Sequence, residues 1–414
     1  MVEAANYIVL AIPVFFLLIG VELCIDKING TQNYRLNDSI SNLNAGITDQ
    51  VLSVFSKLIL IGIYALVYEH LRFFTIPSNI FTWVILFIGV DFFYYWFHRY
   101  AHEINFLWGG HVVHHQSEEY NLSVALRQGA FQKFGSFIFY LPLAFIGFDP
   151  VMFIIISQFQ TLYQFWIHTK AIQLLPAPIE FIFNTPSHHR VHHGRNPKYI
   201  DKNHGGTLII WDRMFGTFQK EEEEVVYGIT KPLNSWNPII AQIDFWRSLI
   251  IDLSKTSSFT NKLKLLTAAP GWYPKELGGP VIVPEINEDS FKKYDINLPP
   301  SLNSYIFIQF VFILAFTSLF LFSFESYDLL TRVLFAGIII FSITCSGLLL
   351  ELKRVAFIVE IIRLLIFPLF CWYLYEQNFA DIKSNFILYI ILALTIISLF
   401  FFIPFKKYFF NDEI

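Results

Sequence analysis

Nine long apolar runs constrain the fold of this chain more than any other feature. A helix that spans a bilayer needs about 20 mostly apolar residues, so these runs predict membrane-spanning helices. The runs cover residues 7–24, 51–68, 80–97, 134–148, 151–167, 304–324, 329–350, 355–375 and 386–405. The fourth and fifth are short and separated only by Asp149 and Pro150, so they could form a hairpin that does not fully cross.

The composition agrees with a membrane protein. The chain has 414 residues, of which 55% are hydrophobic and 15% charged, whereas soluble domains carry about 25% charged residues. A net charge of −4 leaves no basic surplus for binding nucleic acid. Its three cysteines show no metal-binding spacing and no disulfide framework. We therefore predict an all-α, multi-pass transmembrane helix bundle of about nine spans.

The polar stretches suggest how the chain is organised. A long polar region, residues 169–300, separates five apolar runs from the last four. We expect a membrane domain over residues 1–300, with its core at 91–218, followed by C-terminal transmembrane helices over 301–414. Basic residues in the short loops include Lys27, Arg35, Lys353, Arg354, Lys406 and Lys407. This bias places their side of the membrane, and with it the polar region, in the cytoplasm.

Eight of the twelve histidines fall into three closely spaced groups. The groups are His98 with His102, then His111 with His114 and His115, and finally His189 with His192 and His193. Residues three or four apart share one face of a helix, whereas adjacent residues diverge, so one group can reach two metals. Imidazole suits iron, zinc, copper and nickel. Eight imidazoles are too many for one ion and about right for two.

The remaining histidines are less regular. His168 ends the fifth apolar run, at the same membrane edge as His98, and is either a ninth metal ligand or a structural neighbour. His188 and His204 lie near the groups but off their pattern, so we expect supporting roles or none. His70 falls in a loop on the opposite side of the membrane.

Two acidic residues are candidate catalytic groups. Asp91 lies in the third run, seven residues before His98 and on the same helical face. Ligating histidines usually donate their other ring N–H to a carboxylate or carbonyl, and a carboxylate inside a span usually has a partner. Asp91 could support the metal site in this way or serve helix packing. Glu103 follows His102 and could contact the site, a reductant or only solvent.

The number of histidines favours iron over zinc. Catalytic zinc typically has three protein ligands and an open position. Soluble di-iron proteins use Glu and ExxH motifs on bundle helices, and these are absent here. An all-histidine centre at a membrane edge suits oxidation of an unreactive C–H bond in a lipid chain.

The three groups resemble, in order and spacing, the histidine boxes of the fatty acid hydroxylase and sterol desaturase superfamily. Further segments are similar to the alkylglycerol monooxygenase family. These segments are residues 164–169, 189–196, 201–203, 208–218, 225–230 and 271–272. The chain departs from that family at His188, where the family has Pro, and at His204, where it has Tyr.

This resemblance implies a specific activity. Two iron ions would activate O2, and tetrahydrobiopterin would be the reductant, with Glu103 a possible contact for the pterin. Hydroxylation of the chain carbon beside the ether oxygen of an alkylglycerol would release a fatty aldehyde and a glycerol derivative. The resemblance also implies the endoplasmic reticulum in a eukaryote and the inner membrane in a bacterium.

Two other functions fit the same sequence. One is a hydroxylase or desaturase of sterols, fatty acids or another lipid, with a different electron donor such as a separate redox protein. The other is a metal transporter or sensor with a histidine-rich loop. Such loops tend to be disordered histidine repeats, whereas these boxes have fixed spacing and are interleaved with Trp, Phe and Gly.

Overall fold

The computed structural model describes residues 7–286, 291–377 and 385–410, and its regular elements are helices joined by loops. Within these ranges, β-structure is limited to two isolated bridges, Phe183–Leu208 and Gly194–Tyr227. The all-α prediction is confirmed. The chain forms two compact units, one of Met1–Leu233 with Ala241–Tyr294 and the other of Asn234–Ile240 with Asp295–Ile414.

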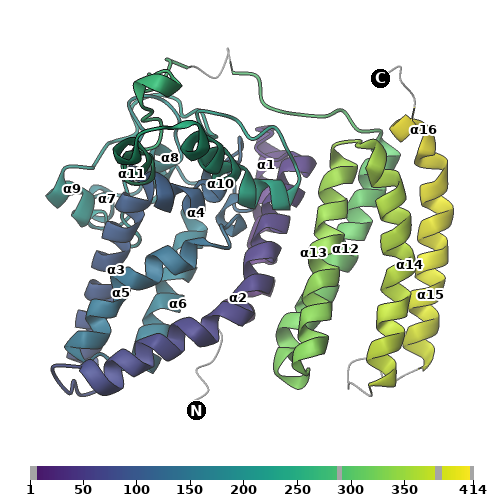
Figure 1. The fold of residues 1–414 in the computed structure, drawn as a ribbon, viewed down its shortest axis with the longest axis horizontal. Coiled ribbons are helices and arrows are strands. Elements are labelled where there is room, and N and C mark those ends of the chain that lie inside the picture. The colour runs from purple at the N-terminus through teal and green to yellow at the C-terminus, as the bar shows by residue number, and fades with distance from the viewer. Residues whose placement is uncertain (1–6, 287–290, 378–384, 411–414) are drawn as a thin grey trace. The chain divides into compact units, whose positions relative to one another are not determined.

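The first unit combines long helices with a cluster of short ones. Its helices are α1 (Tyr7–Asn29), α2 (Leu36–Leu71), α3 (Ile80–Glu103), α4 (Asn105–His115), α5 (Gln132–Ile146), α6 (Pro150–Trp166), α7 (Ala177–Ile182), α8 (Pro186–His192), α9 (Ile210–Phe215), α10 (Pro238–Lys255) and α11 (Phe259–Thr267). Short 3-10 turns occur at Val124–Leu126 and Lys275–Leu277. Figure 1 shows α7, α8, α9 and α11 gathered at one end of α3.

One apolar core joins four of the long helices. Tyr64 of α2, Leu86 of α3, Leu143 of α5 and Met152 of α6 are all buried in it. The start of α6, one of these four helices, is fixed by residues next to it in the sequence. Asp149 accepts hydrogen bonds from the first backbone N–H groups of α6, and Pro150 occupies the first helical position, where proline fits best.

Helix α2 differs most from the sequence-based expectation, because it also covers most of a stretch expected to be loop. Its N-terminal half is polar, yet residues such as Asn42 and Asp49 are buried there. The side chain of Asn42 donates to Asp38 (2.7 Å) and accepts from Arg127 (3.2 Å). These partners satisfy the polar side chains and allow a helix to be buried where the sequence has no apolar run.

Among the described residues, six helices are long and apolar enough to span a membrane, against the nine expected. They are Leu36–Leu71, Ile80–Glu103, Pro300–Ser326, Leu329–Leu350, Arg354–Glu376 and Phe386–Phe410. Helices α5 and α6 have only 15 and 17 residues, which at 1.5 Å per residue falls short of a hydrocarbon core of about 30 Å. Helix α1 is apolar and 23 residues long but is not among the six.

The second unit is a helical bundle. Its long helices are α12 (Pro300–Ser323), α13 (Leu329–Leu350), α14 (Arg354–Glu376) and α15 (Asn385–Phe402), followed by the short α16 (Lys406–Phe410), with 3-10 turns at Phe324–Ser326 and Ile403–Phe405. These four helices run side by side (Figure 1). Inside the bundle, Arg363 donates to both carboxylate oxygens of Glu360 (2.7 Å each) and to Gln309 (2.7 Å). The buried charges are therefore paired, as an apolar surrounding requires.

Gly46 marks a close approach between α2 and the turn at Val124–Leu126. A Cβ at this position would lie 2.2 Å from the Leu126 carbonyl oxygen, whereas one at Gly62 of the same helix would meet nothing within 4 Å. We expect Gly46→Ala to destabilise the protein by about 1–3 kcal/mol through overpacking. Gly62→Ala should be neutral, or stabilising by up to about 1 kcal/mol, because Ala has the higher helix propensity. Thermal unfolding in detergent measures both, and equal melting temperatures would contradict the close approach.

Candidate metal centre

The first two histidine boxes lie on consecutive helices that meet at a sharp break. Helix α3 carries His98 and His102 in its last turns and ends at Glu103. The backbone of Ile104 is extended, and α4 begins directly after it. Asn105 secures this junction, since its backbone N–H donates to Ala268 O (2.9 Å) and its side chain to Leu265 O (2.8 Å). The break turns the histidines of α4 towards those of α3.

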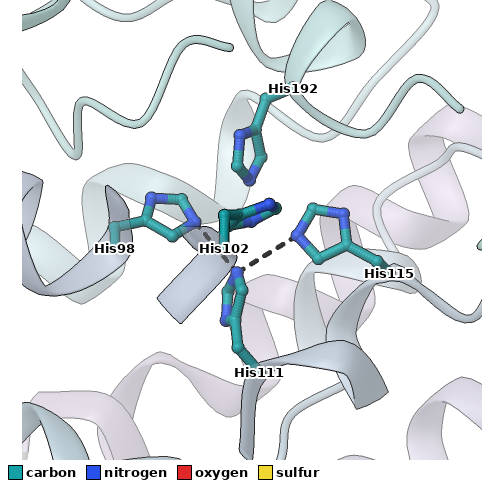
Figure 2. A group of neighbouring side chains, drawn as sticks. All are labelled: His98, His102, His111, His115 and His192. Carbon is teal, nitrogen blue, oxygen red and sulfur yellow. Dashed lines mark hydrogen bonds between the residues drawn. The ribbon is translucent and has the colours of Figure 1, made fainter. Parts of the chain in front are cut away.

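Nine histidines assemble into two groups, each able to hold a metal ion. The group of five consists of His98, His102, His111, His115 and His192, and the group of four of His114, His168, His189 and His193. Within each group, one nitrogen from every ring lies within 4.8 Å of those of the others. Figure 2 shows the five rings of the first group converging from α3, α4 and α8. The structure thus brings together all nine histidines that the sequence singled out.

The second and third histidine boxes share the spacing HxxHH, and each contributes to both groups. His111 and His115, four residues apart on α4, belong to the group of five, whereas His114 points into the group of four. The third box shows the reverse division, with His189 and His193 in the group of four and His192 in the group of five. The helical spacing explains this, because residues four apart share a face and the adjacent residue leaves it. The two groups adjoin, and the rings of His115 and His193 stack at 4.3 Å.

The inner nitrogens of these rings are close together. In the group of five, His111 Nε2 lies 2.9 Å from His98 Nε2 and 3.1 Å from His115 Nε2. In the group of four, His189 Nε2 lies 3.0 Å from His168 Nε2 and 3.2 Å from His193 Nε2. His102 Nε2 and His192 Nε2 are buried and have no hydrogen-bond partner among the described residues. Buried nitrogens without partners that face one centre fit a bound cation.

The outer nitrogens explain why the inner ones are available. Acceptors that lie opposite Nδ1 are His204 O for His98 (2.8 Å), Gln132 Oε1 for His111 (2.7 Å), Arg127 O for His114 (2.8 Å), Gln164 O for His168 (2.7 Å) and Lys202 O for His192 (2.9 Å). A carbonyl oxygen can only accept, so these five Nδ1 atoms carry the proton. Each Nε2 then keeps its lone pair for a metal.

Burial keeps the imidazoles neutral. All nine are between 1% and 6% exposed. Burial is the largest cause that lowers the pKa of His114 to about 4 and the pKa of His192 to about 3. Burial likewise lowers the pKa values of His168 and His193 well below the usual range. Near neutral pH these rings are unprotonated, which is the form that binds a metal.

The other three histidines lie outside both groups. His188 Nε2 pairs with Glu180 Oε2 at 3.0 Å. His204 is fully buried beside the group of five, and its backbone carbonyl is the acceptor for His98. His70 is exposed near the end of α2. Both ring nitrogens of His204 are buried and have no hydrogen-bond partner among the described residues, so the expectation of a supporting role or none for these residues stays a prediction.

Asp91 is completely buried, but its contacts do not include a histidine of either group. Its carboxylate accepts from four donors, which are Gln160 Nε2 (2.8 Å), Thr207 N (2.7 Å), Leu208 N (3.0 Å) and Trp211 Nε1 (2.9 Å). Asp91 thereby ties α3 to α6 and to the segment that follows His204. These contacts favour a positioning role, and a catalytic role for Asp91 stays a prediction.

Glu103 is half-buried and accepts from Arg99 Nε at 2.8 Å. The acidic residue beside His102 is instead Asp201, whose Oδ1 lies 3.5 Å from His102 Nδ1. A catalytic or reductant-binding role for Glu103 stays a prediction.

Sequence patterns did not single out Gln132, Arg127 or Lys202 as residues that orient the histidines. Arg127 and Lys202 act through backbone carbonyls, which every residue carries.

The fold and the two histidine groups define a multi-pass membrane protein with places for two closely spaced metal ions. The Fatty acid hydroxylase family profile matches residues 83–217, a range that contains all nine histidines. No solved structure matches the chain.

Three relatives match most of the chain. Alkylglycerol monooxygenase from Xenopus tropicalis is 41% identical over 371 residues, which are 88% of this chain and 82% of the relative. The Homo sapiens protein of that name is 42% identical over the same shares. That from Danio rerio is 39% identical over 87% of this chain and 81% of its own length. The chain belongs to the alkylglycerol monooxygenase family, which confirms the resemblance seen in the sequence.

The two acidic candidates should respond differently to mutation. Asp91→Ala leaves four buried donors without an acceptor, at about 1–3 kcal/mol each, so we expect at least about 4 kcal/mol of destabilisation. Glu103→Ala breaks one partly exposed ion pair and should cost about 0–1 kcal/mol. Thermal unfolding of both variants in detergent gives the comparison. A melting temperature for Asp91→Ala close to that of Glu103→Ala would show that the four hydrogen bonds do not hold this region together.

Proposed function

We propose that the nine histidines hold two iron ions, one in the group of five and one in the group of four. The observation that carries this proposal is the convergence of buried Nε2 atoms in two adjoining groups. Imidazole is a good ligand for iron, and the hydrogen bonds at Nδ1 hold each ring in the orientation and tautomer that ligation requires.

The number of histidines supports iron in the group of five. Five histidines in one group exceed the four ligands of a tetrahedral zinc site.

The reaction we propose is hydroxylation of an ether lipid. An alkylglycerol, O2, two electrons and two protons would give water and a hemiacetal, in which the chain carbon beside the ether oxygen has gained a hydroxyl group. The hemiacetal would then collapse to a fatty aldehyde and glycerol. Bound iron would supply the activation of O2. The family relationship supports this substrate, because the relatives bear the name alkylglycerol monooxygenase.

The position of the site suits a substrate that lies partly in lipid. His98 and His102 occupy the last turns of α3, one of the six helices able to span a membrane. A lipid tail could therefore stay beside apolar helices while its ether carbon reaches the histidines. Burial of all nine rings also keeps bulk water away from the place where oxidation would occur.

The electrons would come from tetrahydrobiopterin, which the family resemblance implies, and a separate redox protein is the alternative. Such a reductant would reach the centre from the polar side, where the short helices gather (Figure 1). The basic short loops support a cytoplasmic position for this side. The membrane would be the endoplasmic reticulum in a eukaryote and the inner membrane in a bacterium.

Removal of one ligand should empty only the group to which it belongs. We expect His168→Ala to lower iron from about two to about one per chain, and His102→Ala to do the same in the other group. Both variants should lose turnover, since the chemistry needs both ions. His70→Ala, which changes an exposed histidine, is the matched control and should keep both ions. Mass-spectrometric metal analysis of purified protein tests this, and two tightly bound ions in His168→Ala would exclude His168 as a ligand.

The activity can be measured directly in membranes. With a labelled alkylglycerol, O2 and tetrahydrobiopterin, we expect fatty aldehyde from the wild type and none from His102→Ala. Omission of the pterin should abolish the product. Aldehyde formation that depends on another donor would overturn the choice of reductant. Hydroxylation of a fatty acid or sterol, without ether cleavage, would favour the broader lipid hydroxylase.

A further inference from the structure

One short loop supplies the outer contacts of three histidines in the group of five. The loop consists of residues 201–204, which lie shortly after His193 in the sequence. Lys202 O faces His192 Nδ1 (2.9 Å), and His204 O faces His98 Nδ1 (2.8 Å). Asp201 Oδ1 lies 3.5 Å from His102 Nδ1.

The group of four has different supports. His114 and His168 are oriented by the carbonyls of Arg127 and Gln164, which lie on other segments. Among the described residues, none of the outer contacts found for the group of four comes from the 201–204 loop. The loop is therefore specific to one of the two proposed metal positions.

The loop has an unusual backbone that needs a constraint. Asp201 and Asn203 both adopt left-handed conformations, with φ of +56° and +58°. Asn and Asp tolerate this region better than other residues with side chains, but it still disfavours an L-residue. A loop with two such residues keeps its shape only where surrounding contacts fix it.

Asn203 provides that constraint. Its side chain is fully buried, and its amide makes three hydrogen bonds. Asn203 Nδ2 donates to His188 O (3.0 Å) and to Gln219 O (2.7 Å), and Asn203 Oδ1 accepts from Gln219 N (2.8 Å). The backbone N–H of Asn203 also donates to Thr217 O (3.0 Å). These bonds tie the loop to α8 and to residues 217–219 without touching any ligand ring.

We propose that Asn203 is a positioning residue for the group of five, acting through the carbonyls of Lys202 and His204. This inference rests on the proposed metal centre. Asn suits the position because it combines tolerance of a left-handed backbone with an amide that both donates and accepts. Loss of a partner that orients a metal ligand typically weakens metal binding 10–100-fold. Metal binding should therefore weaken in the group of five and stay unchanged in the group of four.

The test is the iron content of variants of the full chain purified in detergent. Asn203→Gly keeps the left-handed backbone accessible and removes the three amide hydrogen bonds. We expect its iron to fall from about two to about one per chain after dialysis against a mild chelator, which corresponds to binding weakened 10–100-fold at one position. Mössbauer spectra of the protein loaded with iron-57 should show loss of one of the two iron signals.

Double variants assign that loss to a group. Asn203→Gly combined with His102→Ala should still hold about one iron, since both changes affect the group of five. Asn203→Gly combined with His168→Ala should hold almost none, because each change then empties a different group. The reverse pattern, or loss of both ions in the single variant while it remains folded, would overturn the inference.

A matched control separates positioning from a general loss of stability. Asn121 is also fully buried, and its amide also makes three hydrogen bonds, to Asn33 O (2.7 Å) and with Ser123 N (3.0 Å) and Ser123 Oγ (2.6 Å). Asn121→Gly should lower the melting temperature by a similar amount yet keep the iron in the group of five. Loss of that iron in Asn121→Gly as well would make the effect of Asn203 a nonspecific one.

A second variant serves if Asn203→Gly does not fold. Asp201→Gly preserves the left-handed backbone and removes a side chain that is 40% exposed, so it should fold. We expect weaker iron binding at the group of five only, and unchanged iron in both groups would overturn the role of the loop. The proposed metal centre is tested separately, since a wild type without bound iron refutes the centre, whereas a wild type with two ions and insensitive loop variants refutes only this inference.

Discussion

The burial of nine imidazoles is the constraint on which the rest of the first unit depends. Each imidazole has two polar nitrogens, and burying such a nitrogen is costly unless it has a partner. The outer nitrogens of His98, His111, His114, His168 and His192 meet oxygen acceptors in the protein. The inner nitrogens face one another across two small spaces, where bound cations would satisfy them. Every segment that supplies an outer acceptor is thereby part of the proposed metal centre.

Helix α3 connects the membrane to this centre. Its apolar length makes it one of the six helices able to span a bilayer, and its last turns carry two histidines of the group of five. In its middle, Asp91 accepts four hydrogen bonds from α6 and from residues 207–211. The same helix therefore carries two histidines of the site and holds the chain segment that orients His98. A change in the packing of α3 would therefore alter the proposed metal site without changing any ligand.

The two histidine groups have separate supports although they adjoin. The group of five depends on Gln132 and on the 201–204 loop, whereas the group of four depends on the carbonyls of Arg127 and Gln164. Separate supports would allow two bound ions to differ in affinity and in their response to mutation.

The sequence by itself determined the features that depend on a few neighbouring residues. Apolar runs predicted the long helices, and the HxxHH spacing predicted that one box reaches two metals, because both follow from the geometry of a single helix. The apolar runs also predicted that α5 and α6 are short, whereas the buried polar half of α2 and the partners of Asp91 were not predictable in this way. Asp91 bonds residues 69 to 120 positions away, and Asn42 is held by Arg127, 85 positions away. Only the tertiary structure decided these contacts, and with them the place of His168 and the role of the 201–204 loop. The physical reason is that a hydrogen bond to a backbone carbonyl leaves no trace in residue type, since every residue has the same carbonyl and only the fold decides which one faces a histidine.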